Sequence, residues 1–167
     1  AVKTRNITAA MQFYSLFDFE ATHKFRAGPA RAAWLQNGGP IVLELIEVPS
    51  YILQETEGHR KRALDLIKYP GVLGYNHVAF DVTDDVKKCG LSSLDAWIDT
   101  LNSKSLQMFG NTLRVAVKSR QQLIGREVYE ITFICDADGS LIEFIFKTAQ
   151  LKQEISSGWE PVDDITI

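Results

Sequence analysis

One order of predicted elements occurs twice along the chain, and this repetition limits the fold more than any other feature. In each copy an extended segment is followed by an amphipathic helix and then by three further extended segments. Clusters of Gly, Pro, Asn and Asp separate the extended segments, as expected of turns between strands. The sequence therefore predicts an α+β fold built from two tandem βαβββ modules, residues 1–49 and residues 72–148.

Apolar spacing places one helix in each module. The residues that fall on one helix face are Ile7, Ala10, Met11 and Tyr14 in the first module and Leu94, Trp97, Ile98 and Leu101 in the second. This i, i+3, i+4, i+7 spacing is typical of an amphipathic helix. Asn6 is a suitable N-cap for the first helix. Ser92, with Asp95 three residues later, resembles a capping box and predicts the start of the second helix.

Residues 50–71 join the modules and are expected to form a linker helix that ends at Pro70-Gly71. The basic run His59-Arg60-Lys61-Arg62 within it is interpreted as a solvated helix face rather than an anion site. Residues 1–148 are expected to form a single domain. Residues 149–167 would then be a C-terminal tail, which either packs over the domain or binds a partner.

Composition excludes several classes of partner. The 167-residue chain has a net charge of −3 and a pI near 5.6, so no overall basic character predicts binding to nucleic acid or to anionic membranes. No apolar run approaches the roughly 20 residues of a membrane-spanning helix. Two cysteines do not make a disulfide framework, so we expect a soluble protein in a reducing compartment, cytoplasmic or inside an organelle. The start at Ala1 rather than Met is compatible with a removed targeting peptide.

Polar residues inside two apolar strands mark a candidate site. Alternation along a strand places Glu143 in one row with Leu141 and Ile145, and a buried carboxylate in such a row needs a partner. Glu44 has the same position in the last strand of the first module, although Glu47 lies nearby and a register shift of one residue would exchange the faces. His77 lies in the opening strand of the second module. The three side chains converge if the two sheets form one concave surface.

Three motifs occur in order within this repeat: Phe13-Tyr14-Ser15-Leu16-Phe17-Asp18-Phe19, Tyr75-Asn76-His77-Val78-Ala79-Phe80-Asp81-Val82 and Asp136-Ala137-Asp138-Gly139-Ser140-Leu141-Ile142-Glu143. Together they resemble the vicinal oxygen chelate superfamily, whose members have the glyoxalase fold. Asp18 stands where the superfamily commonly has Gly, and Ala137 stands where its closing hairpin commonly has Pro. The resemblance covers about residues 1–148 and implies two modules that form one curved sheet.

The resemblance also implies a site. By position, His77, Glu143 and Glu44 would hold a divalent metal such as Zn, Ni, Co, Mn or Fe, and Glu143 would be the catalytic base. A fourth ligand would come from the first strand and, counted back from Phe13-Tyr14, would fall one or two positions before Ala1. Residues 1–5 include no His, Gln or Glu, so this ligand either lies upstream of Ala1 or is absent from the protein. The implied activity is that of lactoylglutathione lyase (glyoxalase I), acting on a small carbonyl compound or thiol adduct, for example the glutathione adduct of methylglyoxal.

Other interpretations stay open at this point. The same fold also serves as a non-catalytic binding module or as a subunit of a larger assembly, and a homodimer is compatible with the two-module layout. An Fe(II) ring-cleaving dioxygenase is the weakest alternative, because it requires two histidines and a glutamate. His23 and His59 lie in other segments than His77. Glu143 would otherwise belong to a hydrogen-bond network, and His77 would be a histidine of the core.

Overall fold

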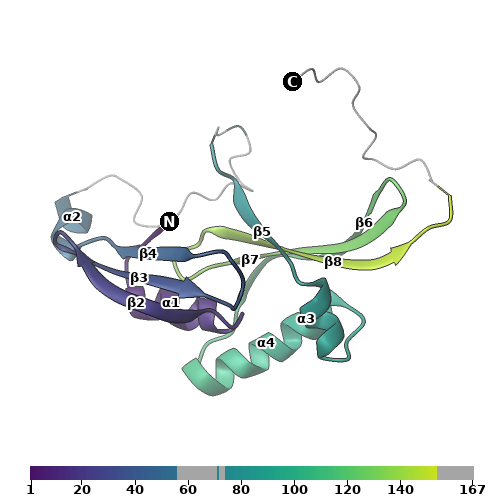
Figure 1. Ribbon diagram of the computed structural model, residues 1–167, viewed down its shortest axis with the longest axis horizontal. Helices are drawn as coiled ribbons and strands as arrows, with labels where there is room; N and C mark the ends of the chain where they lie inside the picture. Colours follow the sequence, from purple (N-terminus) through teal and green to yellow (C-terminus); the bar gives the residue numbers. More distant parts are fainter. Residues whose placement is uncertain (56–70, 72–73, 154–167) are drawn as a thin grey trace.

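Both modules contain the predicted order of elements. The computed structural model describes residues 1–55, 71 and 74–153 (Figure 1). The first module consists of β1 (Val2–Thr4), α1 (Ile7–Ser15), β2 (Glu20–Ala27), β3 (Ala30–Gln36) and β4 (Leu43–Glu47), and α2 (Ser50–Glu55) follows it. The second consists of β5 (His77–Asp81), α3 (Thr83–Lys88), α4 (Leu94–Phe109), β6 (Arg114–Ile124), β7 (Glu127–Cys135) and β8 (Leu141–Gln150).

The strands form two four-stranded sheets of identical topology. Their strand orders are β1-β4-β3-β2 and β5-β8-β7-β6. In each sheet the first strand of the module pairs in parallel with the last, and the remaining pairs are antiparallel. The predicted tandem βαβββ repeat is therefore confirmed, as two separately hydrogen-bonded sheets.

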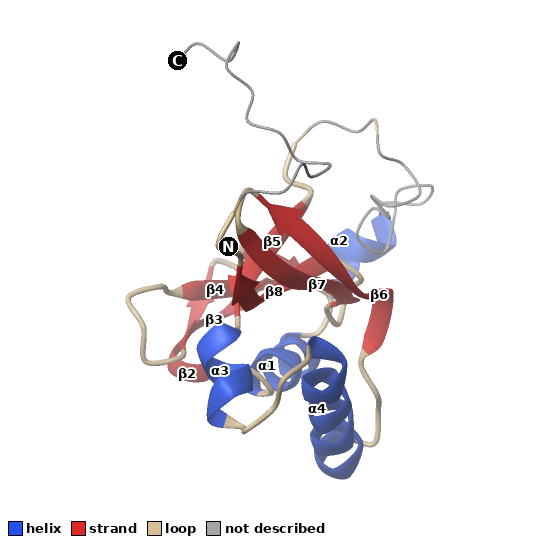
Figure 2. Cartoon of the chain, turned by 90° about the vertical axis from the view of Figure 1, so that its right-hand side faces the viewer, coloured by secondary structure: helices blue, strands red, loops and turns tan. Residues whose placement is uncertain are grey.

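The helices α1, α3 and α4 lie together on one side of the sheets (Figure 2). Strand alternation turns Leu45 and Phe144 toward this helix side, where they are 0% and 1% exposed. The neighbouring residues of the same strands, Glu44 and Glu143, point to the opposite side. We call this opposite side the open side of the sheets.

One hydrophobic core joins the two modules. Phe17, just after α1, packs against Phe144 of β8 and Trp97 of α4, with ring centroids 5.0 and 6.2 Å apart. Phe19 of the first module likewise contacts Phe80 of β5 at 6.0 Å. Aromatic side chains bury the largest areas of any residues, so these contacts hold the modules together as one unit.

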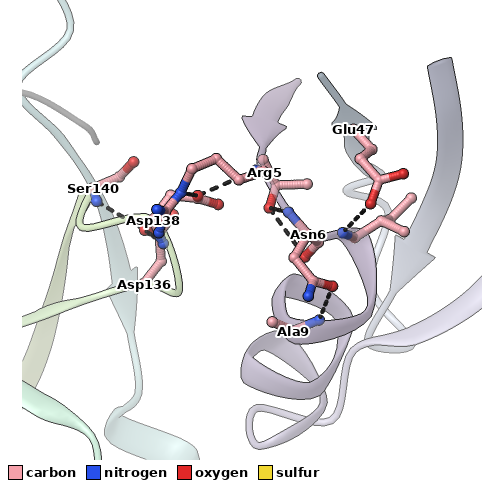
Figure 3. A network of polar contacts seen from close by, with 9 residues as sticks. Arg5, Asn6, Ala9, Glu47, Asp136, Asp138 and Ser140 are labelled. Carbon is pink, nitrogen blue, oxygen red and sulfur yellow. Dashed lines mark hydrogen bonds and ion pairs between the residues drawn. The ribbon is translucent and has the colours of Figure 1, made fainter. Parts of the chain in front are cut away.

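A polar clasp connects the modules at the edge of this core (Figure 3). Arg5 precedes α1, and its Nε donates to Asp138 Oδ1 in the β7–β8 loop at 2.8 Å; its backbone N–H donates to the same oxygen at 3.2 Å. Asp136 in that loop accepts from the backbone N–H groups of Asp138 and Ser140 at 2.9 and 2.8 Å. The predicted Asp/Gly hairpin therefore has a second role, as the contact between modules.

Burial changes the titration of two groups next to this clasp. Burial raises the pKa of the Tyr14 phenol above its usual range, and the nearby charge of Asp136, which accepts a hydrogen bond from this phenol, adds to the effect. Burial also raises the pKa of Asp136, while the backbone N–H groups of the loop act in the opposite direction. Tyr14 is therefore a neutral hydrogen-bond donor that fixes Asp136 from the first module.

The helix starts test the capping predictions. Asn6 caps α1, because its side chain accepts from the backbone N–H of Ala9 at 3.1 Å, as predicted. The prediction of Ser92 as the cap of α4 is wrong by one residue. Ser93 is the N-cap, and its Oγ accepts from Ala96 N–H at 3.3 Å. Both serines suit a cap chemically, and the extended backbone of Ser93 decides between them.

Element lengths differ from the sequence predictions in the second module. The strand β8 continues to Gln150, beyond the predicted module end at residue 148, and β6 reaches Ile124. The short α3 was not predicted, because Val86 is its one buried residue and gives no helical period. The expected linker helix is helical over Ser50–Glu55, and the rest of it lies outside the described residues, as does the tail from residue 154. Within the described part of the chain, no helix has the length and apolar character needed to cross a membrane.

Candidate functional site

Equivalent strand pairs of the two modules place equivalent residues on the open side. Trp34 of β3 is paired with Glu44 of β4, and Phe133 of β7 is paired with Glu143 of β8. Paired residues of adjacent antiparallel strands share a face. Each module therefore presents an aromatic ring beside a glutamate at the same position of its sheet.

His77 and Glu143 are in direct contact in the second module. His77 Nε2 lies 2.8 Å from Glu143 Oε2, and the two side chains are 30% and 13% exposed. His77 Nδ1 lies 2.9 Å from Asn76 Oδ1, and the ring packs edge-on against Phe133 with centroids 5.1 Å apart. The imidazole is thus oriented by one aromatic ring and two oxygen atoms. The sequence-predicted convergence of His77 and Glu143 is present in the structure.

Both ring nitrogens of His77 face oxygen atoms. Because carboxylate and amide oxygens only accept, both contacts are hydrogen bonds only when both nitrogens carry a proton. The His77 imidazole and the Glu143 carboxylate are the groups that would hold a divalent cation at this position. An imidazole nitrogen and a carboxylate oxygen are donors that Zn, Ni, Co, Mn and Fe(II) accept, so the chemistry of the pair fits such an ion.

Glu44 has a different partner. Its Oε1 accepts a hydrogen bond from Trp34 Nε1 at 3.2 Å. Among the residues that the structure describes, no three His, Cys, Asp or Glu side chains are grouped so that they could hold a metal ion. The structure therefore brings His77 and Glu143 together but does not add Glu44 to them, and the three-residue metal site stays a prediction.

The ambiguity between Glu44 and Glu47 is resolved by the register of β4. Glu47 lies on the helix side, where Oε1 accepts from Ile7 N–H at 3.1 Å and from Arg31 Nη2 at 2.6 Å. The hydrogen bond from Arg31 is the main reason why the pKa of Glu47 lies below its usual range. Glu47 therefore supports the start of α1, and Glu44 is the carboxylate of this strand on the open side.

The same register locates the predicted fourth ligand. Ala79 is paired with Glu143, and extension of the β1–β4 pairing from Val2 and Leu45 places Ala1 opposite Glu44. His77 precedes Ala79 by two residues, so its counterpart in the first module falls two positions before Ala1. This position lies outside the 167 residues, and the fourth ligand stays a prediction.

Sequence reasoning missed the aromatic residues of the open side. Trp34 and Phe133 contact Glu44 and His77, and His23 of β2 packs against Trp34 with centroids 5.4 Å apart. The only available signal was that each aromatic residue precedes its glutamate by ten positions. His59, considered for a dioxygenase site, lies outside the described residues, and His23 lies in the other sheet from His77.

Comparison with known proteins gives matches at the level of structure. No protein-family model and no curated protein matches the sequence. A glyoxalase family protein from Bacillus cereus matches with a TM-score of 0.58 and 15% identity, over 89% of this chain and 91% of that one. A glyoxalase family protein from Enterococcus faecalis matches with a TM-score of 0.55 and 19% identity, over 86% of this chain and 90% of that one. The trypanothione-dependent glyoxalase I of Leishmania major matches with a TM-score of 0.50 and 14% identity, over 87% of this chain and 81% of that one.

These matches extend over most of each chain, and the sheet topology of both modules agrees with them. At such low identities the likeness concerns the arrangement of the backbone. The chain therefore has the vicinal oxygen chelate fold of the glyoxalase proteins, with two βαβββ modules around one core.

Proposed function

We propose that this protein is a glyoxalase I-like, metal-dependent lyase or isomerase that acts on a small carbonyl compound or thiol adduct. The contact between His77 Nε2 and Glu143 Oε2 on the open side is the observation that carries the proposal. The matching position of Glu44 in the other sheet supports it. His77, Glu143 and Glu44 would hold the ion, and the bound ion would supply Lewis acidity toward two neighbouring oxygens of the substrate.

The residues of the pair have distinct roles in this proposal. Glu143 would act as the base that takes the proton from the carbon next to the carbonyl and returns it to the adjacent carbon. The low exposure of its side chain limits hydration, which strengthens its interaction with a bound substrate. His77 would stay oriented by Phe133 and Asn76 throughout. The small molecule would lie on the open side of the second sheet.

Metal analysis of the purified protein tests the ion-binding half of this proposal. We expect about one divalent ion per chain, as in other sites with His and Glu ligands. His77→Gln and Glu143→Gln should each lose the ion. Glu47→Gln is the matched control, because Glu47 lies on the helix side and should not affect metal content. Equal metal content in all four proteins would contradict the assignment.

Turnover of the hemithioacetal formed from methylglyoxal and glutathione tests the reaction. Loss of the base should lower kcat of Glu143→Gln by about 100-fold or more, within the range usual for general acid–base catalysis. Glu47→Gln should keep normal turnover. Absence of turnover in the metal-loaded wild-type protein would exclude this substrate.

A non-catalytic binding module is the second candidate. It is favoured by the separation of Glu44 from the His77–Glu143 pair among the described residues and by its hydrogen bond to Trp34. Such a protein would bind a small molecule on the open side, as a homodimer or within a larger assembly. A wild-type protein that holds no divalent ion after dialysis against Zn, Ni, Co, Mn or Fe(II) would support this candidate over the enzyme.

A further inference from the structure

Four side chains form a patch on the open side of the first sheet, apart from the His77–Glu143 pair. The patch consists of His23 and Phe25 from β2, Trp34 from β3 and Glu44 from β4. The Trp34 ring lies 5.4 Å from the His23 ring and 5.3 Å from the Phe25 ring, at interplanar angles of 65° and 72°. Its indole N–H donates to Glu44 Oε1 at 3.2 Å. We call these residues the aromatic–carboxylate patch.

The sheet register assembles this patch, with the help of an irregularity in β2. His23 is paired with Trp34, and Trp34 with Glu44. The pairing shifts between Ala21 and His23, so Thr22 is an extra residue, and its hydroxyl donates to the carbonyl of Trp34 at 3.2 Å. Bulges of this kind change the direction of a side chain. Here the bulge turns His23 to the face of Trp34 and Phe25.

The rings of the patch are accessible. Trp34 is 41% exposed and Phe25 is 36% exposed, although both are large apolar residues. Single exposed apolar residues are common, but adjacent aromatic rings with a carboxylate at their side are a typical contact surface. The near-perpendicular packing leaves ring faces in several directions, and ring faces carry the negative part of the aromatic quadrupole.

The charges in and around the patch determine which class of ligand it can bind. Glu44 is its carboxylate, and Glu20 lies on the same face through its pairing with Gln36. Lys3 is paired with Ile46, which lies on the same face of β4 as Glu44. Among the described residues of the first sheet, Lys3 is the basic side chain on the open side. Lys24 and Arg26 alternate to the other side of β2. His23 and Glu44 are the metal-ligating side chains of the patch, fewer than the three or four that usually hold a bare metal ion, and an anion would be repelled by the carboxylates.

We propose that the aromatic–carboxylate patch binds a small organic cation of the alkylammonium class. Ring faces attract a cationic head group and also bury its methyl groups, and the Glu44 carboxylate neutralises its charge. The proposal goes beyond the lyase activity and requires neither a metal nor turnover. Glu44 is common to both proposals, so a metal ion bound there should reduce cation binding.

Choline is a suitable probe, and its uncharged isostere 3,3-dimethyl-1-butanol is the control ligand. Each would be titrated with the metal-free protein in EDTA, and the N-methyl or C-methyl proton signal would be followed by NMR. We expect an upfield ring-current shift and saturable binding for choline, with at least about fivefold weaker binding of the isostere, as the cation–π energy implies. Equal affinity for both ligands would overturn the proposal.

Variants separate the contributions of charge and rings. Glu44→Gln and Trp34→Leu should each weaken choline binding by about fivefold or more, while Trp34→Phe should keep more binding than Trp34→Leu. Lys24→Gln is the matched control, because Lys24 lies between His23 and Phe25 but points to the other side of β2. Unchanged affinity in Glu44→Gln, whose shape is that of the wild type, would overturn the proposal even if Trp34→Leu did not fold.

A second copy of the chain is the competing occupant. Analytical ultracentrifugation and acrylamide quenching of wild type and Trp34→Phe would detect a dimer that shields Trp34. A dimer in which Trp34 is shielded and choline does not bind would overturn the proposal. Because the protein is metal-free throughout, choline binding and lyase activity can fail independently. Choline binding by the metal-free protein, without hemithioacetal turnover by the metal-loaded protein, would leave this inference intact and exclude that substrate.

Discussion

Single residues show where the chain departs from local preference. Asp18 follows α1 with a φ of 59°, the left-handed region, and it is the one non-glycine residue with positive φ among those described. It stands at the position of the resembled motif where Gly is common, and a positive φ is the conformation that favours Gly. Asp tolerates this conformation better than most residues but at some cost. Its ion pair with Lys104, 3.7 Å away, is exposed and contributes little.

Replacement of Asp18 should therefore stabilise the fold. We expect Asp18→Gly to raise the free energy of unfolding by about 0.5–1 kcal/mol, because glycine has no Cβ to strain in this region. Urea unfolding measures the change. Lys104→Gln is the control and should leave stability within about 0.5 kcal/mol of wild type, as is usual for exposed ion pairs. A destabilised Asp18→Gly would show that the ion pair outweighs the strain.

Glu47 is a single residue that should make the stability of the fold depend on pH. Its pKa is lowered from its ordinary value of 4.5, chiefly by the hydrogen bond from Arg31. A lowered pKa in the folded state means that the stabilisation is present above pH 4.5 and is lost as the pH falls through the folded pKa. The difference in unfolding free energy between wild type and Glu47→Gln should therefore shrink below pH 4.5. Denaturant unfolding at a series of pH values measures it, and a constant difference would contradict this role.

At the scale of elements, the start of α4 is fixed by side chains from two segments. Ser93 caps the helix, and Glu130 of β7 accepts from Leu94 N–H at 2.7 Å. The first backbone N–H groups of a helix lack partners within it, so both contacts satisfy donors that would otherwise be free. The helix thus begins where a strand of the same module can reach it.

The adjacent serines allow a matched comparison. Ser93→Ala should destabilise the protein by about 1 kcal/mol, the usual effect of removing an N-cap. Ser92→Ala should have almost no effect, because Ser92 is exposed and precedes the cap. Thermal unfolding of the two variants measures the difference. A larger effect from Ser92 than from Ser93 would place the helix start one residue earlier.

The sequence predicted elements where periodicity was strong and failed where tertiary contacts decide. Apolar spacing located α1 and α4, and alternation placed Glu143 and Glu44 on the open side. The contact of His77 with Glu143 followed from the repeat. The partner of Glu44 could not be predicted, because the hydrogen bond from Trp34 depends on the register of two strands. In α3 the one buried residue is Val86, and one apolar position is too few to define a helical period.

At the scale of the whole molecule, contacts of two kinds, apolar and polar, join the modules. The aromatic cluster around Phe17 and Phe144 is apolar, and the clasp between Arg5 and Asp138 is polar and partly buried. The side chain of Asp138 is 10% exposed, which makes its ion pair with Arg5 stronger than one at the surface. The positions of the two open sides relative to each other therefore depend on the β7–β8 loop.

Loss of the clasp should be measurable as a loss of stability. Asp138→Asn should lower the unfolding free energy by about 1–3 kcal/mol, the range for a hydrogen bond to a charged, partly buried group. Asp85→Asn is the control, since Asp85 forms an exposed pair with Lys88 at 4.0 Å. It should change stability by less than about 0.5 kcal/mol. Chemical denaturation measures both, and equal effects would mean that the clasp contributes no more than a surface pair.

The parallel pairing of β5 with β8 sets an order of events during folding. The β6–β7 and β7–β8 hairpins pair strands that are adjacent in the sequence. In contrast, α3, α4, β6 and β7 all lie between β5 and β8 in the sequence. Closing so long a loop is slow compared with forming a hairpin. Because β8 carries Glu143 and β5 begins at His77, we expect this pair to assemble after the two hairpins. A chain still emerging from the ribosome would thus fold most of its second module before it had a candidate site.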